Sequence, residues 1–421
     1  GFFICAGCSY AAEIGDYNGL QACLESGSNV DGIKKDIFKA RTNSRTIFIP
    51  NSLTIKGDGH NININDLGNM FTVTQTNIFV KLISAAVKKG EYESSGGAVS
   101  LMGNNSALRV EGNSSFEGNR SSESGGAAYA SNGSALIFSE NTKFQNNRAK
   151  DGGAVCLAGA SADFSKTVLT ASNNSASAGN GGFLSASGAG NIIFGKAVFE
   201  NNKAAAGEKG RGGAVYAQGN TNMNFTKDAG FSGNSAYSAG AVYAADGSRA
   251  VFTGEKTAFK DNWSYDSAGA VSIMQNASVD FMNTKLTAQG NKAGTEGLGG
   301  FMHSDNGRAF FKNALIGGDG AAEGNSAGFG AGIYAGNNSN MTFSGETVFR
   351  NNNASAEGGA LYVTANSNVT FDGNSSLVDF SGNMAKEKGG AIAVTNGASV
   401  RMSGKNTRFR ANSAGFGGAV S

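Results

Sequence analysis

The tetrad Gly152-Gly153-Ala154-Val155 is one copy of the pattern from which the architecture of this chain can be inferred. Similar tetrads recur from residue 96 to the end of the sequence, at intervals of 27 to 31 residues and about 29 on average. A period of this size is typical of solenoids, in which each repeat forms one coil and stacks on the next. The twelve tetrads begin at positions 96, 125, 152, 181, 212, 239, 268, 299, 330, 358, 389 and 417.

Alignment of the tetrads separates an inward column from an outward one. The fourth position is apolar in every copy, whereas the position after it varies among serine, tyrosine, cysteine, histidine and alanine. Because side chains alternate along a strand, the apolar column is expected to face the core and the varied column to face outward. The varied column contains Tyr129, Tyr216, Tyr243, His303, Tyr334 and Tyr362.

Two further segments complete each repeat. An alternating triplet such as Leu136-Ile137-Phe138 follows most tetrads, and a Phe-x-x-Asn motif follows the triplet in eight of the eleven complete repeats. Its asparagines are Asn119, Asn147, Asn202, Asn234, Asn262, Asn352, Asn383 and Asn412. With the tetrad strand, these segments predict an all-β fold, a single right-handed parallel β-helix with three short strands per coil of about 29 residues.

Glycine and asparagine are interpreted as parts of the scaffold. Paired glycines allow tight turns where a side chain would clash, and asparagines tolerate left-handed backbone angles while bonding to nearby backbone amides. The clearest glycine pairs in this role are Gly96 with Gly97, Gly125 with Gly126, and Gly152 with Gly153.

Residues 13–95 are expected to form an N-terminal cap and the first, irregular coils. Asp16 is placed to cap a short helix in which Leu20, Cys23 and Leu24 share one face, and this helix would cover the open end of the solenoid. The expected strands of the irregular coils are 46–49, 53–56, 62–64, 71–73 and 79–83. Residues 96–421 form the repeat region, which stops inside a tetrad strand and is therefore interpreted as truncated.

Residues 1–12 resemble the remnant of a secretion signal, an apolar run followed by small residues. Ser9-Tyr10-Ala11 fits a cleavage site, whereas Ala6-Gly7-Cys8 is compatible with a lipoprotein signal in which Cys8 is lipidated. A buried N-terminal strand is the third interpretation of the same residues.

Composition excludes several classes of function. The net charge is +2, with 16% charged residues and no basic stripe, so nucleic acid is not expected as a partner. No apolar run is long enough for a membrane-spanning helix. Cys23 and Cys156 lie far apart in the sequence, and no disulfide framework, metal site or cofactor follows from the cysteines.

Twelve Gly-Gly-Ala-apolar tetrads combined with eight Phe-x-x-Asn motifs resemble the passenger repeats of the chlamydial polymorphic outer-membrane proteins, which are autotransporter adhesins. The resemblance covers residues 96–421, and residues 47–59 also look like the start of pectin-lyase-like β-helices. It implies secretion, display at the bacterial cell surface or outer membrane, and adhesion to a protein or glycan of a host or neighbouring cell. The family's C-terminal barrel translocator is missing from this chain, which leaves the export route open.

A polysaccharide lyase or hydrolase is the main alternative, because some β-helices carry such sites. Acid–base catalysis on a sugar needs carboxylates within a few ångströms of each other. Asp163 and Asp280, in the outward column of the second strand, are expected to lie four coils apart, roughly 19 Å at the usual ladder spacing. His60 and His303 are the only histidines, and neither is expected to be catalytic or to bind a metal.

The sequence therefore predicts a surface-displayed, adhesin-like chain without enzymatic activity, and a passive structural spacer is the third hypothesis. The binding residues proposed are Tyr129, Tyr216, Tyr243, His303, Tyr334 and Tyr362, because aromatic side chains stack on sugars or anchor proteins at low entropic cost. The alternative is that tyrosine simply favours strands and packs on its neighbours. Uneven repeat lengths also imply loops of differing size on one flank, any of which could hold a recognition site.

Overall fold

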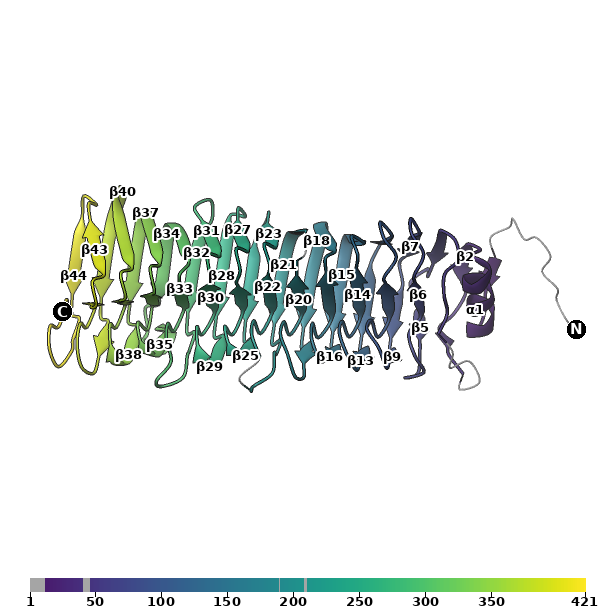
Figure 1. Cartoon of the computed structure of the whole chain (residues 1–421), viewed down its shortest axis with the longest axis horizontal. Helices are drawn as coiled ribbons and strands as arrows, with labels where there is room; N and C mark the ends of the chain where they lie inside the picture. Colours follow the sequence, from purple (N-terminus) through teal and green to yellow (C-terminus); the bar gives the residue numbers. More distant parts are fainter. Residues whose placement is uncertain (1–11, 41–45, 189, 208–209) are drawn as a thin grey trace, which may run out of the picture.

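The computed structural model describes residues 12–40, 46–188, 190–207 and 210–421. In these residues the chain forms one elongated parallel β-solenoid of about 13 turns with about 29 residues per turn. The coils follow one another along the long axis, from the purple N-terminal end to the yellow C-terminal end (Figure 1). The β-helix predicted from the tetrads is thus confirmed.

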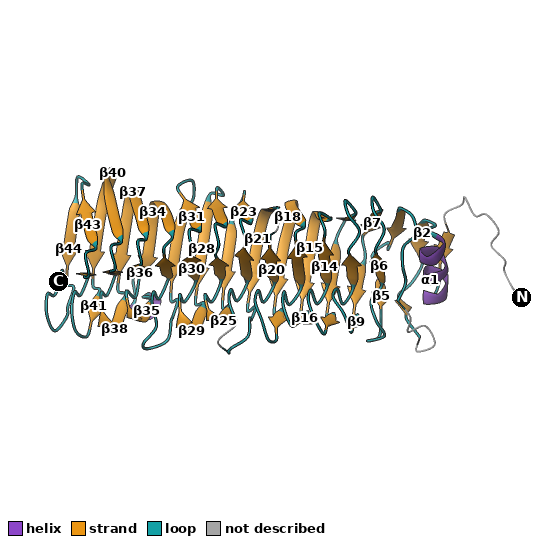
Figure 2. Ribbon diagram, viewed as in Figure 1, coloured by secondary structure: helices purple, strands orange, loops and turns teal. Residues whose placement is uncertain are grey.

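The strands of the coils lie on three faces of the solenoid (Figure 2). The first, here called the tetrad face, is a sheet of 12 parallel strands in the described residues, built from the segments that follow the glycine pairs. Its strands are β6 (Phe71–Val73), β10 (Val99–Leu101), β14 (Ala128–Ser131), β17 (Val155–Ala158), β20 (Leu184–Ser187), β22 (Val215–Gln218), β26 (Val242–Ala244), β30 (Val271–Met274), β33 (Met302–Asp305), β36 (Ile333–Gly336), β39 (Leu361–Val363) and β42 (Ile392–Val394).

The second, here called the broad face, holds the triplet and Phe-x-x-Asn segments, which either form two strands or merge into one long bent strand. Its strands are β1 (Ala12–Ile14), β2 (Val30–Ile33), β3 (Ile37–Phe38), β4 (Leu53–Lys56), β5 (Asn61–Asn63), β7 (Phe79–Ile83), β8 (Ala86–Lys88), β11 (Ala107–Glu111), β12 (Ser114–Glu117), β15 (Ala135–Gln145), β18 (Ser161–Ser172), β21 (Asn191–Glu200), β23 (Asn222–Phe225), β24 (Ala229–Ser232), β27 (Arg249–Phe252), β28 (Lys256–Lys260), β31 (Ser278–Phe281), β32 (Lys285–Gln289), β34 (Arg308–Gly317), β37 (Asn340–Arg350), β40 (Asn368–Ser381), β43 (Ser399–Met402) and β44 (Thr407–Arg410).

The third, here called the short face, lies between the asparagine turn and the next tetrad and consists of short strand groups. They are β9 (Glu91–Tyr92), β13 (Arg120–Ser121), β16 (Arg148–Ala149), β19 (Ser175–Ala176), β25 (Ser235–Ser238), β29 (Trp263–Ser267), β35 (Ser326–Phe329), β38 (Asn353–Glu357) and β41 (Met384–Ala385), with the 3-10 turn η2 (Ala321–Glu323) before β35. Loops of variable length follow these strands, so the short face is where coils differ most.

The N-terminal end is covered by helix α1 (Tyr17–Ser26), as predicted (Figure 1). The carboxylate of Asp16 accepts a hydrogen bond from the Gly19 amide at 2.9 Å, which satisfies one of the free donors of the first turn. Leu20 and Leu24 are buried against the first coils, and Cys23 packs beside them at the edge of the core. The helix thus shields apolar side chains that an open coil would expose to water.

Of the predictions about the N-terminal part, one strand is not formed and the signal remnant lies almost wholly outside the described residues. Residues 46–49 do not form the expected strand; only a single bridge joins Phe48 to Thr72. Ile47 and Ile49 are buried on either side of the exposed Phe48, so the segment keeps the alternation of a strand although it pairs by only one bridge. The proposed signal remnant, including Cys5 and Cys8, falls almost wholly outside the described residues, which begin at residue 12.

The core is a stack of phenylalanine rings. On the broad face, the third triplet position forms a continuous column in which neighbouring ring centroids lie 4.4 to 5.5 Å apart, running through Phe138, Phe164, Phe194, Phe225, Phe252, Phe281, Phe311, Phe343 and Phe371. The phenylalanines of Phe-x-x-Asn stack in a second column beside it, for example Phe231 on Phe259 at 4.7 Å. Rings from adjacent coils therefore bury each other, which a single coil cannot do.

The second column has gaps at Ala171 and Ala288, and the altered tetrads fill them. In register, Phe144 pairs with Ala171 and Ala171 with Phe199. The same coil carries Phe183 in place of the usual tetrad alanine, and its ring lies 5.5 Å from Phe144. In the coil of Ala288, Phe301 lies 5.6 Å from Phe259 in the same way. The altered tetrads thus restore packing volume from the opposite face of the coil.

The motif asparagines form a buried ladder along the solenoid. The Nδ2 group of Asn262, for example, donates to the backbone oxygen of Phe231 at 3.0 Å and to Oδ1 of Asn291 at 2.9 Å, while Asn262 Oδ1 accepts from both the backbone amide and Nδ2 of Asn234. The ladder runs through Asn119, Asn147, Asn174, Asn202, Asn234, Asn262, Asn291, Asn325, Asn352, Asn383 and Asn412. Each side chain therefore ties together three coils.

The role expected for these asparagines is corrected in one respect. The left-handed backbone angle falls on the residue before the motif asparagine, as at Asn146 and Asn173, with φ of 56° and 55°. The motif asparagine itself bonds to other coils rather than to its own turn. Sequence spacing alone does not separate the two positions, because both are often asparagine.

The two glycines of a tetrad are required for different structural reasons. Gly152 adopts a left-handed φ of 59°, which a side chain disfavours. Gly153 lies so close to the next coil that an added Cβ would stand 2.1 Å from the Gly182 oxygen. The second glycine is thus required by coil spacing rather than by backbone angle.

Candidate binding surface

The varied column predicted as a binding face lies on the outer side of the tetrad face. Adjacent strands pair Tyr216 with Tyr243, Tyr243 with Ser272, Ser272 with His303, His303 with Tyr334, and Tyr334 with Tyr362. Five of the six proposed residues therefore lie in one row over six successive coils. Tyr129 lies three coils before Tyr216, beyond Cys156 and Ser185.

The row, hereafter the outer tyrosine row, differs in accessibility along its length. Tyr129, Tyr334 and Tyr362 are half-buried, whereas Tyr216 is 4%, Tyr243 7% and His303 5% exposed. The expectation of six open aromatic side chains is therefore too simple. Two residues that directly precede a tetrad fold over the row: Phe329 lies 5.3 Å from the Tyr362 ring, and Arg211 lies 5.4 Å from the Tyr243 ring centroid.

The rings of the row stack on one another. Tyr216 and Tyr243 have centroids 5.4 Å apart, and Tyr334 and Tyr362 have centroids 5.3 Å apart, both nearly parallel. His303 meets Tyr334 edge-on at 5.2 Å. Such stacking is the packing role that the sequence left open beside binding.

Burial determines the electrostatics of the row. It raises the pKa of Tyr216 to about 12 and also raises the pKa of Tyr243 and Tyr334, so these phenols stay neutral. Burial lowers the pKa of His303 to about 4, although the charges of Asp305 and Asp266 oppose the shift. Nδ1 of His303 has no hydrogen-bond partner among the described residues. The imidazole is therefore neutral at pH 7.

Carboxylates on the solenoid take part in local contacts. Asp163 and Asp280 are four coils apart, as the column alignment predicts, through Ile193, Asn224 and Val251. Asp163 accepts from the Ser165 amide at 2.8 Å, and Asp280 binds Arg249 at 3.2 Å. Within the part of the chain that the structure describes, no three histidine, cysteine or acidic side chains gather as a metal site would require.

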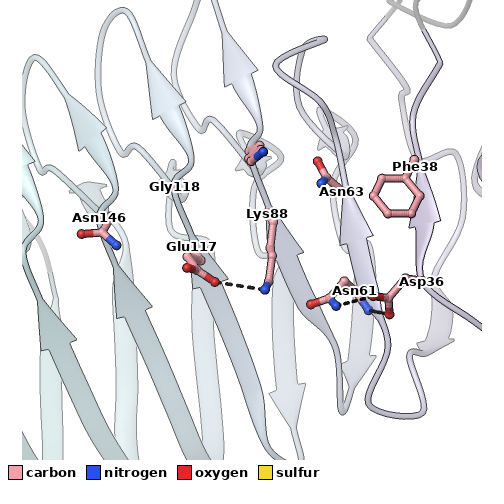
Figure 3. A pocket seen from close by; sticks show the side chains of 9 residues that line it. Asp36, Phe38, Asn61, Asn63, Lys88, Glu117, Gly118 and Asn146 are labelled. Atoms are coloured by element: carbon pink, nitrogen blue, oxygen red, sulfur yellow. Dashed lines mark hydrogen bonds and ion pairs between the residues drawn. The ribbon is translucent and has the colours of Figure 1, made fainter.

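A hollow of about 340 Å³ lies over the first coils, between Phe38 and Glu117 (Figure 3). Its charged side chains are paired across coils: both carboxylate oxygens of Asp36 accept from Asn61, at 2.8 and 2.6 Å, and Lys88 lies 3.1 Å from Glu117. These hydrogen bonds lower the pKa of Asp36. His60 approaches the same carboxylate at 3.4 Å. The contacts join neighbouring coils, so we assign this hollow a structural role.

The two cysteines that the structure describes are not activated for nucleophilic chemistry. Cys23 and Cys156 are both free thiols. Burial raises the pKa of Cys156 to about 12 and also raises that of Cys23, which disfavours the thiolate needed for nucleophilic chemistry.

One group of aromatic residues was missed by the sequence reasoning. Tyr237, Trp263 and Tyr265 lie on β25 and β29 of the short face, outside the aligned motifs. The signal was present as an alternating Trp-x-Tyr segment, but no column of the repeats drew attention to it. Two of these residues, Trp263 and Tyr265, are exposed, and Tyr237 is half-buried.

Comparison with known proteins finds one repeat family. The model of the Chlamydia polymorphic membrane protein repeat matches residues 113–131, 196–218, 346–364 and 368–395, each of which spans a Phe-x-x-Asn motif and the tetrad after it. Neither the search of curated proteins nor the search of solved structures found a match. No helix among the described residues is long and apolar enough to cross a bilayer.

The fold and the repeats together define a parallel β-solenoid built from repeats of about 29 residues. The chain carries the repeats of the Chlamydia polymorphic membrane protein family, as its motifs indicated. This family implies a bacterial outer-membrane or surface location.

Proposed function

We propose that the chain is an adhesin-like passenger that binds a partner on a host or neighbouring cell through the outer surface of the solenoid. The observation that carries this proposal is the contrast between the inward columns, which stay apolar from coil to coil, and the outer tyrosine row, where polar, aromatic and small residues alternate. Packing requires uniform inward columns, whereas it does not require variation on the outside. The surface location implied by the repeat family supports the same function.

The accessible part of the row is Tyr334 with Tyr362, and Tyr129 farther along. A half-buried pair of stacked rings offers a rigid, amphipathic contact with little entropy left to lose on binding. We place the binding role on these three tyrosines rather than on Tyr216 and Tyr243, which are covered. No catalytic step, cofactor or metal enters the proposed function.

The test is binding of the purified chain to cultured epithelial cells before and after the triple change Tyr129→Ser, Tyr334→Ser and Tyr362→Ser. We expect at least a ten-fold loss of cell binding, with an unchanged circular dichroism spectrum. The matched control is Phe79→Ser, an exposed aromatic residue on the broad face. Equal binding by the triple variant and the parent would exclude the outer tyrosine row as the adhesive surface.

A further inference from the structure

The short face carries an exposed group of rings, hereafter the aromatic corner, made of Tyr237, Trp263 and Tyr265. Trp263 is the only tryptophan of the chain and is 42% exposed, and Tyr265 is 62% exposed. Between them Ser264 is fully buried, because alternate side chains of β29 point to opposite sides. The two large rings are therefore directed outward by the strand itself.

The three rings adopt a defined arrangement. Tyr237 and Tyr265 stack in adjacent coils with centroids 6.0 Å apart and planes 17° apart. Trp263 stands at 89° to Tyr265, with centroids 5.9 Å apart. Contact between the rings restricts their rotation, so their outer surfaces form a preorganised apolar corner.

The corner forms part of a hollow of about 710 Å³. The segment 292–297 of the next coil forms a wall of this hollow and contributes Lys292, which pairs with Trp263 in register, together with Thr295 and Glu296; Asp266 also lines it. The Asp266 carboxylate accepts hydrogen bonds from Ser267 at 3.0 Å and Ser238 at 3.3 Å, which hold it in place. The apolar rings and the held carboxylate of Asp266 thus line the same hollow.

Loop length explains why the hollow occurs at these coils. Seven residues, 292–298, separate Asn291 from the next tetrad, and nine, 203–211, separate Asn202 from its tetrad. Only four residues, 235–238, follow Asn234, and only five, 263–267, follow Asn262. The coils that carry the rings therefore lie between coils with longer loops.

Close packing holds the wall segment against β29. An added Cβ on Gly294 would lie 2.2 Å from the Tyr265 oxygen, and one on Gly297 would lie 2.1 Å from the Asp266 oxygen. The Gly297 oxygen in turn accepts from the amides of Gly328 and Phe329. These glycines allow the segment to approach the strand that presents the rings, and a side chain at either position would displace it.

We propose that the aromatic corner and its hollow form a glycan-binding site for β-linked oligosaccharides of glucose, galactose or N-acetylglucosamine. The apolar C–H face of such a sugar ring packs on Trp263 or Tyr265, and its hydroxyl groups donate to Asp266 and Glu296. This assignment names a ligand class within the proposed adhesive function and rests on that function for its biological setting.

The chemistry of the hollow favours a glycan over other ligands. A nucleic acid requires a basic surface, whereas two carboxylates and one lysine surround the rings. A stable protein interface buries about 800 Å² on each partner. The hollow, at about 710 Å³, falls instead in the range of about 300–1,000 Å³ that is usual for small-ligand sites. A sugar alone among these ligands offers both an apolar face and several hydroxyl donors.

The single tryptophan makes a direct test possible. Fluorescence of Trp263 in the whole chain is recorded during titration with tetrasaccharides of β-linked glucose, galactose and N-acetylglucosamine, and with choline as a cationic probe. We expect a saturable change in fluorescence with at least one tetrasaccharide, and at least ten-fold weaker binding in Tyr265→Ala. No saturable change with any tetrasaccharide, or a change with choline alone, overturns the proposal.

Matched variants separate this site from the outer tyrosine row. Binding of the responsive tetrasaccharide is also measured by calorimetry in Trp263→Ala, expected to lose binding at least ten-fold, and in Tyr362→Ser, expected to bind as the parent does. Gly294→Ala retains every ring and is expected to weaken binding by displacing the wall segment. Equal sugar affinity in Trp263→Ala and the parent would contradict the assignment.

The same proteins distinguish failure of this inference from failure of the adhesive function. A chain that binds cells but no tetrasaccharide overturns the glycan site and leaves the adhesive function intact. A chain that binds a tetrasaccharide at Trp263 but no cells supports the site and overturns cell adhesion.

Discussion

The asparagine ladder inside the solenoid and the outer tyrosine row are both columns of residues in register, yet they follow opposite rules. In the ladder every coil repeats the same residue, and the side-chain amide of Asn262 has partners in the coils on either side. In the row residues vary, and the Ser272 hydroxyl and His303 Nδ1 are buried without partners among the described residues. The comparison indicates that stacking enforces sequence identity where each polar side chain bonds to the same residue type in the next coil.

The largest effect is expected in the phenylalanine core. Phe183→Ala should lower the free energy of unfolding by about 4 kcal/mol, because its ring fills the space beside Ala171. Adding Ala171→Phe to this variant should restore a substantial part of the loss. Urea unfolding of both variants measures this, with Phe79→Ala, an exposed ring, as the control. A double variant no more stable than Phe183→Ala would show that the two positions do not share one cavity.

Breaking the ladder is expected to be next in size. Asn262→Ala removes the acceptor of two Asn234 donors and the donor to the Phe231 oxygen, which should cost about 3 kcal/mol. Hydrogen exchange should show the loss of amide protection centred on the coils on either side of residue 262. Asn222→Ala, at an exposed position, is the control. A loss of less than about 1 kcal/mol would mean that the ladder is not the main tie between coils.

The outer row is expected to respond to pH. The pKa of His303 is about 4 in the folded chain and has its ordinary value of 6.5 in the unfolded chain, so the unfolded state takes up the proton first as pH falls. The contribution of the neutral imidazole is complete above pH 6.5 and is lost as pH falls toward 4. Between pH 7 and 5 this amounts to about 2 kcal/mol.

The check is the stability of the parent relative to His303→Tyr, which places at this position the residue found in neighbouring coils. The difference between the two proteins should change by about 2 kcal/mol between pH 7 and 5, with the parent losing more. Parallel curves for the two proteins would contradict the burial of His303.

The smallest effect is expected at the first tetrad glycine. Gly152→Ala should cost about 1 kcal/mol, because alanine already occupies the same left-handed position at Ala239 and Ala268, with φ of 58° and 57°. Gly153→Ala should cost more, because its Cβ would meet the backbone of the next coil. Thermal unfolding of the two variants decides the order, and equal shifts would mean that backbone angle rather than coil spacing governs both.

The sequence predicted the fold more completely than it predicted the candidate site. The tetrads predicted the solenoid, the inward columns and the neighbour relations Tyr216–Tyr243 and Tyr334–Tyr362, because stacking in register converts sequence period into spatial adjacency. The compensation of Ala171 by Phe183 could also have been found, since the two tetrads with phenylalanine at the third position, at 181 and 299, follow repeats with Ala171 and Ala288 in place of the motif phenylalanine. It was missed because residues on opposite faces of one coil are not neighbours in an alignment.

The candidate site was harder to predict than the fold, because it depends on which side chains the tertiary structure covers. Tyr243 is buried where Arg211, from the segment before a tetrad, lies over the row, and the hollow beside Trp263 arises where longer loops lie in the coils on either side. Neither property belongs to a single repeat, so no single repeat could reveal it.

From the sequence alone came the period, the inward or outward direction of the aligned columns and the four-coil separation of Asp163 from Asp280, because alternation and repeat length are local properties of the chain. Only the tertiary structure decided which outward residues meet solvent and which asparagine bonds across coils. Those outcomes depend on how irregular loops pack over regular strands, and this packing joins residues that the period does not bring into line.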